Sequence, residues 1–180
     1  MISWFKDGKT LAKRYAWEIV MGAYDNFIKE QSLVDLVVPP GATCDVIGDV
    51  HGMVFCSIRK WTRTRRSYSD GWWTGQFYDM MNLFSLTGPP SEKHYLLMNG
   101  DLVDRGSWSV EVILVAFAYK CGCSFIVLAD THFTKFETGL YPKFMYINRG
   151  NHEAKDMNRT YGFEGEVKHK HGEQAYKACH

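Results

Sequence analysis

The chain has 180 residues, of which 46% are hydrophobic and 23% charged, as is ordinary for one globular domain with its own core. A formal net charge of +1 gives the whole molecule no bias toward nucleic acid, and no apolar run approaches the ~20 residues of a membrane span. Five cysteines is an odd number, and the first residues do not resemble a signal peptide. We therefore expect free thiols in a reducing compartment, cytoplasmic or nuclear.

Residues 9–30 are predicted to form a helix, because apolar side chains recur at every fourth position from Leu11 to Phe27. Three short apolar runs follow later in the chain, each ended by glycine and a polar residue. Their lengths and residue types are typical of buried strands. The runs and the turns behind them are Cys44–Ile47 before Gly48-Asp49, Tyr95–Asn99 before Gly100-Asp101, and Phe144–Asn148 before Arg149-Gly150-Asn151-His152.

Helical patterns follow the first two of these runs, over residues 77–84 and 110–118. A repeated order of strand, polar turn and helix predicts an α/β fold. In open α/β sheets, functional sites form beyond the carboxyl ends of the strands, which is where all three polar turns would lie. Glycines in these turns allow the backbone to bend sharply and to approach a ligand closely.

The three turns together contain side chains that suit metal-assisted phosphate chemistry. Carboxylate, imidazole and amide oxygen donors suit divalent Mn, Fe or Zn, and two such ions can clamp a phosphoryl group for in-line attack. An arginine can hold phosphate oxygens, and a histidine off the metals can protonate the leaving group. The residues pooled in this way are Asp49, His51, Asp101, Asp104, Arg105, Asn151, His152 and Glu153.

Each turn alone has a simpler explanation. A lone Asp-x-His is more often a turn capped by its own side chain, and Asp104 could simply cap a helix. The sequence Cys121-Gly-Cys123 lacks the two-residue gap of common zinc and redox motifs, so we do not expect a site there. Three polar turns after three apolar runs are nevertheless hard to explain by capping alone.

The blocks GDVHG, GDLVDRG and RGNHE, in this order, resemble the three signature blocks of the phosphoprotein phosphatase family, the metal-dependent serine/threonine protein phosphatases. The flanking stretches QFYDMMNLFSLTGPPSE, GSWSVEVILVAFAYK and MNRTYGFEGEVKHK also resemble members of this family. The resemblance implies a calcineurin-like metallophosphoesterase sandwich, in which mixed β-sheets are flanked by helices. It also implies hydrolysis of phosphoserine and phosphothreonine on protein substrates.

By position in these motifs, the resemblance implies a role for each residue. Asp49 and His51 would bind the first of two divalent ions (Mn, Fe or Zn, with Mg possible), Asp101 would bridge both, and Asn151 would bind the second and contact the phosphate. Arg105 would hold the substrate phosphate. His152 would be the general acid, oriented by Asp104.

Two segments depart from the family pattern. Residues 53–75 separate GDVHG from QFYDMM, which are contiguous in the family, and residues 121–139 lie between AYK and LYPKFMYINRG. We interpret both as foreign insertions, such as retained introns, within a partial catalytic domain spanning 1–180. Two competing interpretations are single-strand nucleic-acid binding by the Arg/Trp-rich residues 59–73, and an extra strand over 124–128. No nucleic-acid or membrane partner is expected overall.

The family pattern also continues past the last residue of this chain. Two further histidines of the second metal site follow RGNHE at a distance in the family, so we expect the domain to be incomplete at its C-terminus and impaired as an enzyme. His169 and His171 are too close to RGNHE to replace them and are predicted to be solvated surface residues. The tetratricopeptide repeats of some family members are read as absent, so their chaperone partner cannot be inferred.

Two other functions remain open at this stage. The metal motifs alone would also fit a dinucleotide polyphosphate hydrolase, or another phosphoester hydrolase of the same superfamily. The chain could also be a non-enzymatic, phosphatase-derived fragment that acts only by binding.

Overall fold

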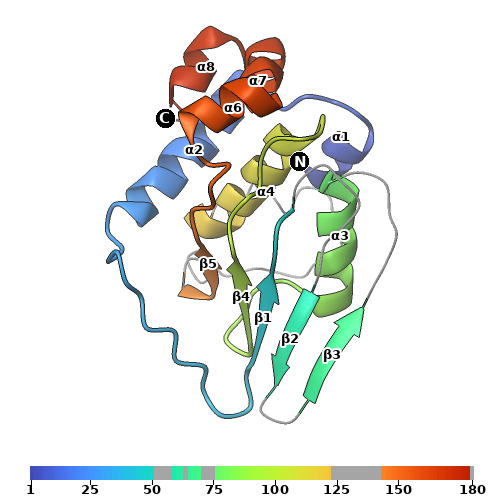
Figure 1. Ribbon diagram of the computed structural model, residues 1–180, viewed down its shortest axis with the longest axis vertical. Helices are drawn as coiled ribbons and strands as arrows, with labels where there is room; N and C mark the ends of the chain where they lie inside the picture. Colours follow the sequence, from blue (N-terminus) through green and yellow to red (C-terminus); the bar gives the residue numbers. More distant parts are fainter. Residues whose placement is uncertain (51–57, 63–64, 70–75, 123–142, 179–180) are drawn as a thin grey trace.

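The computed structural model describes residues 1–50, 58–62, 65–69, 76–122 and 143–178, and these form an α/β fold (Figure 1). The strands are β1 (Thr43–Ile47), β2 (Ile58–Thr62), β3 (Arg65–Ser69), β4 (His94–Met98) and β5 (Met145–Ile147). The helices are α1 (Ile2–Lys6), α2 (Lys13–Phe27), α3 (Gln76–Thr87), α4 (Ser109–Cys121), α6 (Lys155–Tyr161), α7 (Phe163–His171) and α8 (Glu173–Ala178). None of the helices described is both long enough and apolar enough to cross a membrane.

The strands form one mixed sheet in the order β3-β2-β1-β4-β5. The three strands predicted from the apolar runs, β1, β4 and β5, are neighbours and run parallel to one another. Parallel neighbours bring their carboxyl ends to the same edge of the sheet, which places the three polar turns together. Helices α6, α7 and α8 lie beyond that edge (Figure 1).

The order of strands contains one feature that the sequence did not predict. Strands β2 and β3 lie within residues 53–75, and they form an antiparallel pair whose first strand continues the sheet from β1. The proposed extra strand over 124–128 falls outside the described residues. The predicted helices are confirmed with small shifts in their ends, and α2 is shorter than the predicted range of 9–30.

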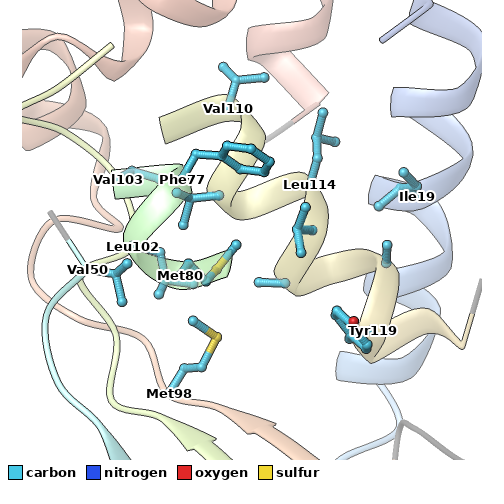
Figure 2. Close-up of a cluster of buried hydrophobic side chains, with 14 of the residues drawn as sticks. Ile19, Val50, Phe77, Met80, Met98, Leu102, Val103, Val110, Leu114 and Tyr119 are labelled. Carbon is cyan, nitrogen blue, oxygen red and sulfur yellow. The ribbon is translucent and has the colours of Figure 1, made fainter. Parts of the chain in front are cut away.

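The main core lies between the sheet and helices α2, α3 and α4 (Figure 2). Ile47 and Met98 are fully buried on the strands, and Phe77, Met80 and Ile19 are buried on the helices. Fully burying each such side chain stabilises the fold by about 1.5–3 kcal/mol relative to its exposure. Cys44, Tyr95 and Phe144 form a smaller buried cluster of their own.

The helix that follows the second turn is fixed at both ends. The carboxylate of Glu166 on α7 accepts hydrogen bonds from the backbone N–H groups of Ser109 and Val110, at 3.2 and 3.0 Å. These two donors belong to the first turn of α4 and have no partner within that helix. At the other end, Gly122 adopts the left-handed conformation that commonly terminates a helix.

Candidate active site

The three polar turns meet at the carboxyl edge of the sheet, and backbone hydrogen bonds join them. The N–H of Asn99 donates to Ile47 O at 2.9 Å, and the N–H of Asn148 donates to Met98 O at 2.8 Å. The N–H of Val50 also donates to Asp101 O at 3.1 Å. The first turn is thus held against the second, and the second against the third.

Two glycines allow the second and third turns to touch. A Cβ atom on Gly100 would lie 2.3 Å from the nitrogen of Gly150, and a Cβ on Gly150 would lie 2.3 Å from Oδ1 of Asp101. Neither position therefore has room for a side chain. The close approach lets the carboxylate of Asp101 accept a hydrogen bond from the backbone N–H of His152 at 2.8 Å.

The second turn has a strained backbone. Asp101, Asp104 and Arg105 all have positive φ angles, of 53°, 73° and 61°. Residues other than glycine seldom adopt this conformation, and such strain gathers at functional sites, where the surrounding structure enforces it. Here the enforcing contacts come from the third turn and from α6 and α7.

Glu153 holds the second and third turns together. Its carboxylate accepts hydrogen bonds from the N–H groups of Asp101 at 2.8 Å, Leu102 at 2.7 Å and Gly150 at 2.7 Å. The sequence placed Glu153 among the polar residues of the turns but gave it no role. The structure shows that it fixes the backbone on both sides of Asp101.

His152 and Asp104 form a buried pair. Nδ1 of His152 lies 2.9 Å from Oδ2 of Asp104, and both side chains are at most 1% exposed. Since an ionised carboxylate can only accept, Nδ1 carries the hydrogen of this contact. The other carboxylate oxygen of Asp104 accepts from the backbone N–H of Phe163 at 3.0 Å. Asp104 therefore fixes both the orientation and the tautomer of the imidazole.

The guanidinium of Arg105 lies next to Nε2, the second ring nitrogen of His152. Its Nη2 is 3.1 Å from Nε2, and its guanidinium also lies over the ring of Tyr161, 5.5 Å from the ring centre. Because a guanidinium can only donate, Nε2 accepts in this arrangement. The exposed Arg105 thus places a guanidinium next to the second ring nitrogen of His152.

Asn158 completes this arrangement, and the sequence analysis missed it. Its buried side-chain amide donates to Oδ2 of Asp104 at 3.1 Å and to the backbone oxygen of His152 at 2.6 Å. The residue lies in α6, where a single asparagine within a helical pattern gives no local signal. Only the packing of α6 against the second turn reveals its role.

A second polar network supports the segment between Arg105 and α4. Lys170 of α7 donates to the backbone oxygen of Ser107 at 2.8 Å and to the carboxylates of Glu111 at 2.7 Å and Glu166 at 2.9 Å. Burial raises the pKa of Glu111, although the nearby Lys170 ammonium acts in the opposite direction. The network ties α7 to the start of α4.

The predicted metal ligands are only partly described. Asp49 of the first turn and Asn151 of the third turn are exposed at the edge of the sheet. Asp101 belongs to the second turn, and His51 lies outside the described residues. Among the residues with described positions, no three His, Cys, Asp or Glu side chains gather as a metal-binding group. The oxygen donors and the close approach of Gly100 to Gly150 nevertheless fit hard or borderline divalent ions at this edge.

The two histidines after RGNHE have different environments. His169 is exposed, as predicted, but the prediction that His171 is a solvated surface residue is wrong, because its ring is buried. The two do face different ways, as their spacing on α7 requires. His171 lies on the inner face of the helix together with Phe163 and Val167, at four-residue intervals.

The comparisons with known proteins agree on one family. Residues 43–179 match the sequence model of the family described as calcineurin-like phosphoesterase. The chain is 42% identical to serine/threonine-protein phosphatase 5 of Arabidopsis thaliana, over 97% of this chain and 25% of that protein. It is 38% identical to serine/threonine-protein phosphatase T of Aspergillus oryzae, over 98% of this chain and 28% of that protein.

A solved structure is also similar. It is a protein serine/threonine phosphatase from Saccharomyces cerevisiae, described as similar to human phosphatase PP5. The match has a TM-score of 0.70 and 34% sequence identity, and it covers 97% of this chain and 43% of that one. The chain thus spans about a quarter of the length of the curated relatives named above and less than half of this structure.

A further match corrects one expectation. Residues 1–35 match a family model described as the PPP5 TPR repeat region. The expectation that the tetratricopeptide region is absent from this chain is therefore wrong. In the structure these residues hold the short α1 and the longer α2, whose buried face packs on α4.

Proposed function

The chain belongs to the calcineurin-like phosphoesterase family, and from this premise we propose that it carries catalytic residues of a protein phosphatase acting on phosphoserine and phosphothreonine. The observation that carries the proposal is the buried His152–Asp104 pair, in which the second ring nitrogen of His152 lies 3.1 Å from Nη2 of Arg105. This arrangement puts a proton donor and a phosphate-binding cation side by side. The names of the relatives support a phosphoprotein as the substrate.

Divalent metal ions are the cofactors that this family implies, and when bound they supply a hydroxide nucleophile at neutral pH. Of the chain's own residues, Asp49 and His51 would hold one ion, Asn151 would hold a second, and Asp101 would contact both. The candidate ions are Mn, Fe, Zn and Mg.

The protein's other residues then act on the phosphate ester. Arg105 binds the phosphate oxygens, and its contacts with His152 and with the ring of Tyr161 keep its guanidinium at this place. His152 protonates the leaving seryl or threonyl oxygen from Nε2, so its present contact with Arg105 gives way when that nitrogen carries the proton. Asp104 holds the ring in place and stabilises the protonated imidazole during this step.

We also propose that the 180-residue chain alone hydrolyses such esters slowly. Residues 53–75 separate the Asp49 turn from α3, which begins at Gln76. A longer loop costs little entropy, about 0.6 kcal/mol per doubling of its length. Catalytic sites, however, tolerate a misplacement of only about 0.5 Å, so an insertion next to a metal ligand lowers activity through geometry.

The experiment that tests the proposal is hydrolysis of a phosphoserine peptide by the whole chain, with and without Mn²⁺. We expect a slow, metal-dependent rate that falls to the metal-free rate in the variant Asp101→Asn. Asp156→Asn, an exposed aspartate on α6, is the matched control and should keep the parent rate. Full activity in Asp101→Asn would contradict the proposed role of Asp101.

Two measurements separate the remaining alternatives. A dinucleotide polyphosphate assayed next to the phosphopeptide distinguishes a protein phosphatase from another phosphoester hydrolase of the superfamily. Elemental analysis of the purified chain should find fewer than two tightly bound metal equivalents. Two tight equivalents would show that the chain alone builds both metal positions.

A further inference from the structure

A cavity of about 270 Å³ lies behind the second and third turns, at the end of α2 and beside α4 and β5. Helix α4 contacts both α2 and β5, and the three elements lie side by side in Figure 1. The volume is close to the lower end of the range of about 300–1,000 Å³ that is typical of small-molecule sites, so the cavity suits a compact ligand. None of the described residues that line it has a proposed role in metal binding, phosphate binding or proton transfer.

The walls of this cavity are apolar, and part of their surface is open to solvent. Phe27 of α2 and Phe117 of α4 meet edge to face, with their ring centres 5.7 Å apart, and both rings are only partly buried. Ile113 and Ile147 are also only partly buried and line the cavity from α4 and β5. Aromatic rings pack on one another in offset or edge-to-face geometry. The accessible walls therefore favour a ligand that contains an aromatic ring.

The opening of the cavity carries a positive charge. Arg149 lines the cavity and is exposed, so its side chain lies where solvent enters. Its Nε donates to the backbone oxygen of Glu153 at 3.0 Å, which holds the plane of the guanidinium. Among the described residues no carboxylate pairs with this guanidinium, so its Nη groups are available to a ligand. A guanidinium held in this way presents a fork of donors that matches a carboxylate.

The other polar side chains of the lining already have partners. The amide of Asn148 donates to Oδ1 of Asn99 at 3.1 Å, and the buried amide of Asn158 donates to Asp104 and to the backbone of His152. The carboxylate of Glu153 accepts the three backbone hydrogen bonds described above. Because Glu153 carries a negative charge, a ligand carboxylate is favoured only at the opening, next to Arg149.

We propose that this cavity binds a compact arylalkanoate, in which a short chain joins an aromatic ring to a carboxylate. The ring lies against Phe27, Phe117 and Ile147, and the carboxylate pairs with the guanidinium of Arg149 at the opening. The short chain keeps the charge in solvent while the ring leaves it, which is the favourable distribution for both groups. The binding is independent of phosphate hydrolysis.

The cavity lies directly behind residues that hold the candidate active site. Glu153 and Asn158 both line it, and so do Leu102 and Val103 of the second turn. A ligand in this cavity therefore packs against the folded arrangement of the two turns and has no such site on the unfolded chain. Its binding should raise the midpoint of thermal unfolding as its concentration increases.

The test is calorimetric titration of the 180-residue chain at about pH 7.5 with 3-phenylpropanoate and, separately, with the neutral analogue 3-phenyl-1-propanol. We expect the carboxylate to bind at least about tenfold more tightly, which is what a hydrogen bond to a charged group contributes. Arg149→Gln should remove about this factor for the carboxylate and leave the affinity of the alcohol unchanged. Arg159→Gln is the matched control, because this exposed arginine on α6 does not line the cavity, and it should change neither affinity.

A second pair of variants tests the apolar wall. Phe27→Leu should weaken the acid and the alcohol by the same factor, several-fold, because it removes a ring contact that both ligands make. Tyr24→Leu, at an exposed position of the same helix outside the cavity, is its control and should bind both ligands as the parent chain does.

Four outcomes would overturn the proposal. These are no binding of 3-phenylpropanoate at millimolar concentration, equal affinity for acid and alcohol, parent-like affinity for the acid in Arg149→Gln, and parent-like affinity in Phe27→Leu. If Arg149→Gln does not fold, Arg149→Lys replaces it. The lysine keeps the charge but not the fork of donors, so it should still weaken the acid relative to the alcohol, and an unchanged ratio of the two affinities would refute the site.

Discussion

In the described part of the chain, two buried aspartate–histidine pairs lie at opposite ends of the same sheet. His152 and Asp104 lie at the carboxyl edge, 2.9 Å apart, and His94 and Asp45 lie at the start of β4 and within β1, 3.0 Å apart. The two pairs are alike in distance and burial. They differ in what the remaining ring nitrogen meets.

In the His94 pair, the second ring nitrogen contacts a backbone carbonyl oxygen. Its Nδ1 lies 3.1 Å from the carbonyl oxygen of Pro89, so both ring nitrogens face acceptors within the fold. In the His152 pair, the remaining nitrogen lies next to the exposed Arg105. Under the proposed function, the pair that acts in catalysis is the one whose second ring nitrogen lies beside an exposed side chain.

The largest expected effect is on the chemistry. His152→Asn should lower metal-dependent phosphopeptide hydrolysis by about 10²–10⁴-fold, the usual contribution of a positioned proton donor. His94→Asn should leave the rate per folded molecule close to that of the parent, because no part of that ring faces the site. The rates are compared after correction for the folded fraction by circular dichroism. Equal losses in the two variants would contradict the distinction.

The next effect is on stability. His94→Ala leaves the carboxylate of Asp45 buried without its partner, and its Oδ1 already has no hydrogen-bond partner among the described residues. Breaking a buried pair in this way lowers the free energy of unfolding by about 3–5 kcal/mol. Urea denaturation measures the change, with the exposed His169→Ala as the control. A change below about 1 kcal/mol would show that the pair contributes little to the fold.

A smaller effect is expected for Asn158, which contacts both members of the His152–Asp104 pair. Asn158→Ala removes the hydrogen bonds to Asp104 and to the backbone of His152, and should lower the free energy of unfolding by about 1–3 kcal/mol. It should also slow phosphopeptide hydrolysis by about tenfold per folded molecule, because the ring of His152 loses part of its orientation. Asn82→Ala, at an exposed position of α3, is the control. An unchanged rate would show that Asp104 orients His152 without help from Asn158.

The smallest effect concerns His171, which is buried and has no hydrogen-bond partner among the residues that the structure describes. Burial lowers the pKa of His171 in the folded protein below its value of 6.5 in the unfolded chain. Above this pH the ring is neutral in both states, and as the pH falls below it only the unfolded state takes up the proton. The free energy of unfolding should therefore decrease by up to about 1.4 kcal/mol per pH unit in this window.

The variant His171→Phe isolates this contribution, because it should show a shallower loss of stability on acidification than the parent chain does. Urea denaturation at several pH values between about 4 and 7 measures both slopes. Identical slopes would mean that His171 gains a proton equally in the folded and unfolded states.

Much of the fold could be predicted from the sequence because its signals are local. Runs such as Tyr95–Asn99, each ended by glycine and a polar residue, indicated the three parallel strands, and the four-residue spacing from Leu11 to Phe27 indicated α2. These patterns depend only on the repeat of a strand or helix. They also placed the polar turns at one edge, since parallel strands share a direction.

The partners of individual side chains were decided only by the tertiary structure. Asp104 hydrogen-bonds to His152, which is 48 positions later in the chain, and to Phe163, which is 59 positions later. Glu153 accepts hydrogen bonds from Asp101 and Leu102, which precede it by 52 and 51 positions. No local pattern carries such pairings. The burial of His171 was likewise missed, because a histidine in a run of charged residues resembles a solvated residue until α4 is packed against its helix. The sequence by itself thus determined strands β1, β4 and β5, helices α2, α3 and α4, and the chemical kinds of residue at the edge of the sheet. Packing determined which of those residues act together, because hydrogen bonds and burial depend on distance in space.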